Sequence, residues 1–261
     1  MVFQKVFNLA IPLSLTAIII SGCIGENLKS AKQTDTLSDA LWELAKGAED
    51  ANDYEKAASH YDRIYARHPQ NKAALLGYAR NLRYLGLATD AIKALQSWKS
   101  LDTHLVLKLE LGKAQLAASL INDALITFTQ IVENDPTQWE AHSALGIIHD
   151  RLNDFEEAHA SYQRALQLSP DNIGVKNNFA LSLSQDGKLD RAITMLEKII
   201  EDNQAGPQTR QNLALLFGLN GEFEKAYALA LTDLPKDLAA RNLLTLKELH
   251  SKEKVKPNKA K

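Results

Sequence analysis

The chain has 261 residues, of which 45% are hydrophobic and 24% charged, and its formal net charge at pH 7 is -2. This composition is typical of a folded protein, and the near-neutral charge gives no indication of nucleic-acid binding, which usually comes with a basic excess. The single cysteine, Cys23, excludes an internal disulfide. The sequence contains no phosphate-binding glycine loop, CxxC pair or HExxH motif. We therefore expect a non-enzymatic protein without a metal, a cofactor or a small-molecule substrate.

Residues 1–22 have the pattern of a secretory signal peptide. Lys5 precedes a mostly apolar stretch over residues 6–20. At about 1.5 Å per residue this stretch is too short to span the roughly 30 Å hydrocarbon core of a bilayer. It ends in Ile-Ser-Gly-Cys at residues 20–23, which resembles the bacterial lipobox. The resemblance implies cleavage before Cys23 and a covalent lipid on its sulfur; the alternative is an ordinary signal peptide with an incidental cysteine.

The residue after the cysteine indicates in which membrane the lipoprotein would be anchored. Ile24 follows Cys23, whereas an aspartate there would favour retention in the inner membrane of a Gram-negative bacterium. The resemblance thus favours an outer-membrane lipoprotein on the periplasmic face, held durably if several acyl chains are attached. Residues 25–36 are polar and lack helical periodicity, and we predict that residues 23–37 form a lipidated N-terminus and a flexible tether.

The rest of the chain is dominated by an internal repeat. One alanine returns at steps of 34, 33, 34, 34 and 34 residues, namely Ala57, Ala91, Ala124, Ala158, Ala192 and Ala226. A period of this size indicates a solenoid of helical hairpins. It predicts repeats at 38–71, 72–104, 105–138, 139–172, 173–206 and 207–235, with a capping helix at 236–250 and a basic disordered tail at 251–261.

Other positions of the repeat support this alignment. A small residue stands at position 8 in Ala45, Ala79, Gly112, Gly146, Ala180 and Ala214, and the recurring alanine is at position 20. Two helices approach closely only where one of them carries almost no side chain. Bulky residues such as Phe128 and Tyr162 stand at position 24, and Pro69, Pro136 and Pro170 at position 32, where proline ends a helix. These columns resemble the tetratricopeptide (TPR) repeat, which implies an all-α, right-handed superhelical solenoid of about six repeats.

The connections also follow the repeat. Glycine or asparagine stands at the predicted turn between the two helices in Asn52, Gly86, Asn153, Gly187 and Gly221, where a positive φ is tolerated. The second repeat is the weakest, because it is one residue short and has Thr103 where others have proline.

A protein partner is expected on one face of the array. In TPR stacks, positions 2, 5, 9, 12 and 13 of the first helix of each repeat point into the concave groove, which here includes Glu49, Asp150, Arg151 and Gln185. Amides, guanidinium groups and aromatic rings suit an extended peptide, although simple solvation of these side chains is an equal alternative. The candidate partner-binding residues are Trp42, Lys46, Arg80, Arg83, Tyr84, Lys113, Asn177 and Gln211.

Two histidines are candidate metal ligands. His142 and His149 lie two turns apart on the first helix of the fourth repeat. No third ligand stands at metal spacing, so we expect a core or groove-edge role.

The last third of the chain is more distinctive. Residues 207–215 read PQTRQNLAL and are followed by GLNG at 218–221, Ala226, Asp233-Leu234 and RNL at 241–243. This succession resembles the C-terminal region of the TadD family, TPR lipoproteins of the Tad (Flp, tight-adherence) pilus system. The resemblance implies an outer-membrane scaffold for pilus assembly whose partner is the pilus secretin or another Tad component.

Two other functions stay open. One is a pilotin-like TPR lipoprotein of type IVa pili, which would serve a different secretin. The other is a periplasmic scaffold that recruits cell-wall hydrolases. Lipid anchoring together with a peptide-binding groove is common to all three hypotheses.

Overall fold

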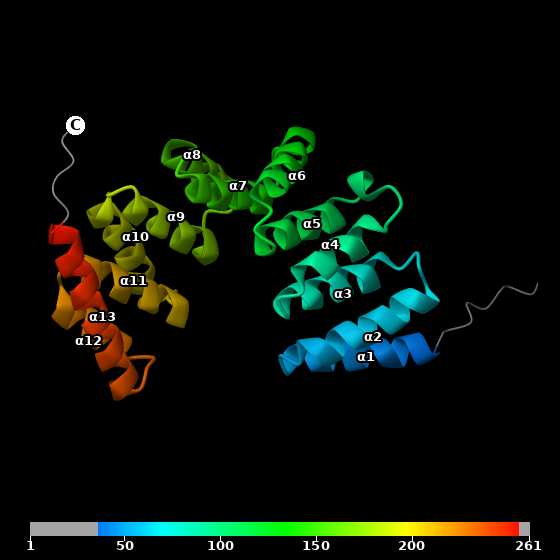
Figure 1. The fold of residues 1–261 in the computed structure, drawn as a ribbon, viewed down its shortest axis with the longest axis horizontal. Coiled ribbons are helices and arrows are strands. Elements are labelled where there is room, and N and C mark those ends of the chain that lie inside the picture. Colours follow the sequence, from blue (N-terminus) through cyan, green and yellow to red (C-terminus); the bar gives the residue numbers. More distant parts are fainter. Residues whose placement is uncertain (1–35, 256–261) are drawn as a thin grey trace, which may run out of the picture. The chain divides into compact units, whose positions relative to one another are not determined.

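The structure is a computed structural model that describes residues 36–255. Within this range the chain forms thirteen α-helices and one short 3-10 helix, with no strand (Figure 1). The first helices of the six hairpins, called A helices, are α1 (Thr36–Asp50), α3 (Lys72–Tyr84), α5 (Leu105–Ala117), α7 (Trp139–Leu152), α9 (Ile173–Gln185) and α11 (Pro207–Leu219). The second, or B helices, are α2 (Tyr54–Arg67), α4 (Ala88–Gln96), α6 (Ile121–Asn134), α8 (Phe155–Leu168), α10 (Leu189–Glu201) and α12 (Phe223–Ala230), and α13 (Lys236–Val255) follows.

The hairpins stack in chain order. From α3 onward, each A helix packs against its own B helix, and from α2 to α10 each B helix packs against the next A helix. Consecutive A helices from α3 to α11 also contact one another directly. The A helices therefore form a continuous layer, and equivalent positions of successive repeats lie side by side along it. This confirms the predicted all-α solenoid of helical hairpins.

The recurring alanine lies at the centre of each hairpin. All six alanines at position 20 are at most 1% exposed. The alanines at position 8 are buried as well, from 0% exposed at Ala45 to 4% at Ala214. Small residues therefore occupy the point of closest helix approach, as the sequence predicts.

Two position-8 residues are glycine because a ring lies against them. A Cβ placed on Gly112 would lie 2.6 Å from the Phe128 ring, and one placed on Gly146 would lie 2.7 Å from the Tyr162 ring. Both rings are almost completely buried. The large side chain at position 24 of these repeats thus requires glycine opposite it.

The turns inside the hairpins have the predicted backbone. Asn52, Gly86, Asn153, Gly187 and Gly221 all have positive φ, between 56° and 83°. In the third repeat Ser119 takes this conformation at φ 59°. Serine is not favoured at positive φ, so the residue type at this position does not indicate the turn.

The second repeat departs from the others at the end of its B helix. Helix α4 stops at Gln96, and the 3-10 helix η1 (Leu101–Thr103) leads into α5. The Trp98 ring lies here, stacked on Tyr65 at 6.5 Å and edge-on to His104 at 5.7 Å. Aromatic packing therefore replaces the proline-terminated helix end of the first, third and fourth repeats.

Helix α13 closes the C-terminal end of the described stack by packing on α11 and α12. A Cβ on Gly218 would lie 2.5 Å from the Leu246 side chain, so α11 and α13 meet closely. Helix α13 runs to Val255, so the prediction of disorder from residue 251 is wrong for residues 251–255. Lysine and glutamate, which make up most of this stretch, have a high helix propensity.

The predicted signal peptide, Cys23 and most of the tether lie outside the described residues. Helix α1 already includes Thr36 and Leu37, which had been assigned to the tether. None of the helices described between residues 36 and 255 combines the length and the hydropathy that a bilayer crossing requires.

The close approach at position 8 can be tested with matched glycine substitutions. Gly146→Ala should lower the free energy of unfolding by about 1–3 kcal/mol, because the Tyr162 ring must shift. Gly47→Ala, in α1 with no atom within 4 Å of the added Cβ, should leave stability unchanged or raise it by about 1 kcal/mol. Urea unfolding followed by circular dichroism measures both, and equal effects at the two sites would contradict the packing argument.

Candidate functional site

The candidate site is the exposed surface of the A-helix layer, which we call the A-face and define by positions 2, 5, 9, 12 and 13 of each repeat. Between α7 and α9 this surface is hollowed into a pocket of about 280 Å³. Asp150, Arg151 and Gln185, three residues assigned to the groove from sequence, line it. The predicted positions therefore do open onto a recess in this part of the A-face.

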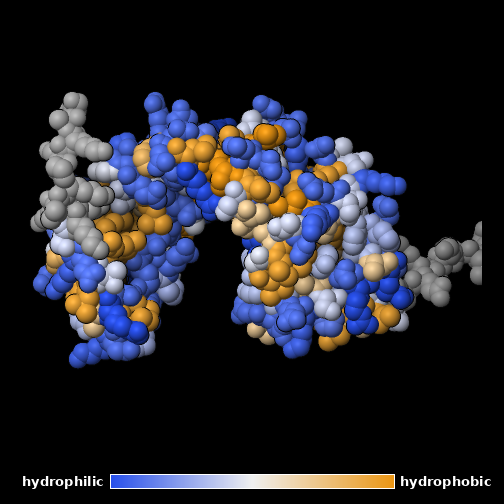
Figure 2. Space-filling model, viewed as in Figure 1, coloured by the Kyte–Doolittle hydropathy of each residue, from blue (hydrophilic) through white to orange (hydrophobic). Residues whose placement is uncertain are grey.

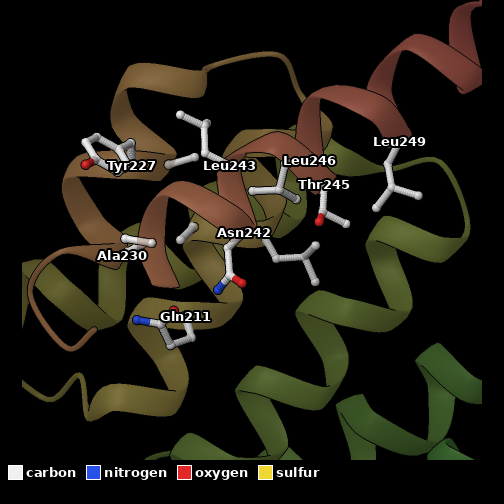
Figure 3. A pocket seen from close by; sticks show the side chains of 12 residues that line it. Gln211, Tyr227, Ala230, Asn242, Leu243, Thr245, Leu246 and Leu249 are labelled. Carbon is white, nitrogen blue, oxygen red and sulfur yellow. The ribbon is translucent and has the colours of Figure 1, made fainter. Parts of the chain in front are cut away.

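A second recess lies where the A-face meets the cap. It has a volume of about 210 Å³ and lies between α11, α12 and α13, with Leu243, Leu246 and Leu249 projecting from α13 toward it (Figure 3). Gln211 and Leu215 of α11 line the same pocket. The surface in general is mixed in polarity, and Figure 2 shows hydrophobic side chains breaking the hydrophilic surface over α6 and α7.

Aromatic rings and cations gather on the first two A helices. Trp42 is half-buried and packs edge-on against Tyr61 at 5.2 Å between ring centroids, and the Lys46 ammonium lies 5.9 Å from the Trp42 ring. Tyr84 is 51% exposed, with its ring 5.0 Å from that of Tyr54. Trp42 is thus partly structural, whereas about half of Tyr84 stays exposed.

The prediction that Arg83 is available for a partner is wrong. Its Nε donates to Glu110 Oε1 at 2.7 Å, and the side chains of Arg83 and Glu110 are only 18% and 3% exposed. The guanidinium also stacks 4.6 Å from the Tyr84 ring centroid. A buried carboxylate needs a partner, so Arg83 joins the second repeat to the third.

Asn177, another predicted partner-binding residue, is buried. It is 2% exposed, and its Nδ2 donates to Ile173 O and Thr209 Oγ1, each at 2.9 Å. Its Oδ1 accepts from Asn212 Nδ2 at 3.1 Å. The asparagine therefore connects α9 to α11 inside the stack, because buried amides must satisfy both donor and acceptor groups.

Acidic side chains at position 12 form a recurrent contact that the sequence analysis missed. Glu49 accepts from the hydroxyl of Tyr61 at 3.1 Å and from Asn81 Nδ2 at 2.7 Å. Asp150 accepts from the Tyr162 hydroxyl at 2.8 Å and from Ser182 Oγ at 2.5 Å. Both contacts join position 12 to position 24 of the same repeat and to position 10 of the next.

These two clusters, which we call the position-12 clamps, restrict the chemistry of the A-face. Burial, and then the neighbouring carboxylate of Glu49, raises the pKa of Tyr61 to about 12. Burial and Asp150 also raise the pKa of Tyr162. Both phenols therefore stay protonated as donors, and the acids opposite them are engaged within the protein. A tyrosine at position 24 that follows an acid by twelve residues is the sequence signal for this clamp.

Gln211 lies on the A-face but has a partner inside the chain. Its Nε2 donates to Asp233 Oδ2 at 3.3 Å, and Arg210 binds the same carboxylate through Nε at 2.9 Å and Nη2 at 2.5 Å. This contact ties the start of α11 to the turn before α13. It uses Arg210 and Gln211 of the PQTRQNLAL segment.

The two histidines of α7 lie in separate surroundings. His142 Nε2 is 3.0 Å from Pro136 O, and His149 Nδ1 is 3.9 Å from Asp154 Oδ2. Residues 36–251 contain no group of three potential metal ligands. The site residues of this part of the chain are therefore suited to hydrogen bonding and apolar contact.

Comparison with known proteins agrees with this geometry. Models of the tetratricopeptide repeat match residues 139–172 and 48–104. A TPR repeat-containing protein of Methanocaldococcus jannaschii is 31% identical over 70 residues, which cover 27% of this chain and 12% of the relative. Cellulose synthase operon protein C of Pseudomonas fluorescens is 23% identical over 177 residues, or 68% of this chain and 12% of the relative.

Solved structures resemble the chain in fold. A thermophilic TPR protein of Thermus thermophilus, TTC0263, superposes with a TM-score of 0.62 at 21% identity, covering 69% of this chain and 98% of its own. MamA of Desulfovibrio magneticus superposes with a TM-score of 0.51 at 19% identity, covering 63% and 94%. The chain is a solenoid of tetratricopeptide repeats, a class of fold that serves as a scaffold for protein–protein interaction.

The ion pair at Asp233 predicts a pH-dependent contribution to stability. The hydrogen bond from Arg210 holds the pKa of Asp233 at about 2, below its ordinary value of 3.8. Because the folded-state pKa is the lower one, the carboxylate stabilises the fold above roughly pH 4 and loses this effect as the pH falls through about 2. Asp233→Asn should therefore lower the urea midpoint at pH 6, and the difference from the parent chain should shrink between pH 4 and pH 2.

Asp171→Asn is the control, since Asp171 lies exposed in the loop before α9. It should leave the urea midpoint unchanged at pH 6. A difference for Asp233→Asn that stays constant from pH 6 to pH 2 would contradict the assignment.

Proposed function

We propose that this protein is a lipid-anchored scaffold of Tad (Flp) pilus assembly, which holds a segment of the pilus secretin on its A-face at the periplasmic side of the outer membrane. The observation that carries the proposal is the pairing of a TPR solenoid with the lipobox-like residues that end at Cys23. The resemblance of residues 207–243 to the TadD family supports the pilus assignment.

The mechanism follows from tethering. A lipid on Cys23 would confine the array to the membrane surface, where secretin subunits have to meet. Binding one segment of each subunit there raises its effective concentration, which promotes assembly without any chemical step. The A-face supports this role because Tyr84 is exposed on it and recesses open beside α7 and α11.

The anchor is tested at Cys23. Mass spectrometry of the chain purified from bacterial membranes should find the leader removed and the N-terminal cysteine acylated. Cys23→Ser should release the protein from the membrane fraction while its helical circular dichroism stays unchanged. An uncut leader or an unmodified thiol in the parent chain would refute the anchor.

The partner is tested by site-specific crosslinking. A photo-crosslinking residue at Tyr84 or Lys113 of the A-face should capture the pilus secretin in outer membranes. The same residue at Lys93 or Lys198 of the B helices, where the lysine side chains are 72% and 66% exposed, should not. Capture of a type IVa secretin, of cell-wall hydrolases, or of the Flp secretin from the B helices alone would each contradict the proposal.

A further inference from the structure

Position 9 of the repeat divides the A-face into two chemically different halves. In the first three repeats every residue at this position is a cation, and in the last three every residue is aliphatic. The column reads Lys46, Arg80, Lys113, Ile147, Leu181 and Leu215. Because consecutive A helices lie side by side, this column forms a row across the stack.

The cations of this row are not engaged by acids of the chain. Within residues 36–251, Lys46, Arg80 and Lys113 form no ion pair. Two acids nearest to them in the repeat are occupied, since Glu110 is paired with Arg83 and Glu49 belongs to a position-12 clamp. A ligand carboxylate would therefore meet cations that form no ion pair within this part of the chain.

The positive charge of the row is not spread evenly over the first three repeats. Asp39 and Asp50 are exposed acids of the first repeat and partly offset Lys46. The positive charge is thus centred on Arg80 and Lys113, in the second and third repeats.

The aliphatic residues of the row line recesses of the A-face. Ile147 and Leu181 line the pocket between α7 and α9, and Leu215 lines the pocket beside α13. Leu215 is 36% exposed although it is a large apolar residue. Apolar side chains at the mouth of a recess gain by excluding water when a ligand side chain enters.

We infer that the A-face binds an extended polypeptide segment with an acidic half, held by Arg80 and Lys113, and an apolar half, held by Ile147, Leu181 and Leu215. The inference rests on the proposed function, because it assumes that this face receives a protein partner, and it adds the chemistry of the segment. Neighbouring packed helices lie about 8–10 Å apart, and an extended chain advances about 3.3 Å per residue. One ligand side chain in every three should therefore meet one repeat.

The test uses fluorescein-labelled peptides of about 15 residues. One peptide carries glutamate at every third residue of its first half and leucine at every third residue of its second half, with serine and alanine between. A second has the reverse order, and a third is a scrambled sequence of the same composition. Fluorescence anisotropy with the full chain should show one ordered peptide binding at least tenfold more tightly than the scrambled peptide.

Matched variants locate the two halves. K46E/R80E/K113E should weaken binding of the preferred peptide at least tenfold, and added salt should no longer lower its affinity, because the charges at these positions then repel the peptide. I147Q/L181Q/L215Q should weaken it similarly with the salt dependence retained. K56E/K93E/K198E changes the same number of charges on the B helices and should alter the affinity less than twofold.

Circular dichroism checks that each variant folds. If a triple variant unfolds, the single variants R80Q and L215Q are used in its place, and each should lower the affinity for the preferred peptide about threefold. Equal affinity for ordered and scrambled peptides, or equal effects of A-face and B-helix variants, overturns the inference. Secretin crosslinking to the A-face without any peptide preference would overturn this inference alone. A peptide preference without secretin crosslinking would overturn the proposed function alone.

Discussion

The architecture depends on the close approach of two helices at one point in every hairpin. Ala57 and its five equivalents are buried because the facing helix leaves no room for a longer side chain. In the third and fourth repeats, where a ring fills position 24, even the methyl group of alanine is too large opposite it, and glycine stands there as Gly112 and Gly146. This contact sets the angle within a hairpin, so the same position of each repeat recurs on the same face.

In a regular stack, the same contact can recur between equivalent positions of successive repeats, just as it does within each repeat. The two position-12 clamps illustrate this, since both join residues 12 and 32 apart in the chain. In the third repeat the equivalent positions hold Leu116, Phe128 and Ile148, which are apolar throughout. In these three repeats the clamp positions are therefore either wholly polar or wholly apolar, because a lone buried polar group would lack a partner. Position 12 therefore contributes more to architecture than to recognition.

The period of the sequence was enough to predict the hairpins and most of their turns, because these features depend on residues close in the chain. Which A-face side chains bind other residues of the chain, and which stay free for a partner, was harder to predict. Arg83 meets Glu110 27 residues later, and Asn177 meets Thr209 32 residues later. Such contacts depend on the offset between neighbouring repeats, which the spacing of small residues does not specify. The turn at Ser119 is not predictable for a different reason, since serine does not indicate a positive φ.

The segment that carries the family resemblance has a structural explanation of its own. Arg210 and Asp233 fasten α11 to the approach of α13, and Asn212 bonds to the buried Asn177. A terminal repeat has no following hairpin, so its exposed end has to be closed by another element. Residues that hold the cap constrain the sequence whatever the partner is. Recognition must then depend on side chains that the stack leaves at least partly accessible, and the row at position 9 is one such set on the A-face.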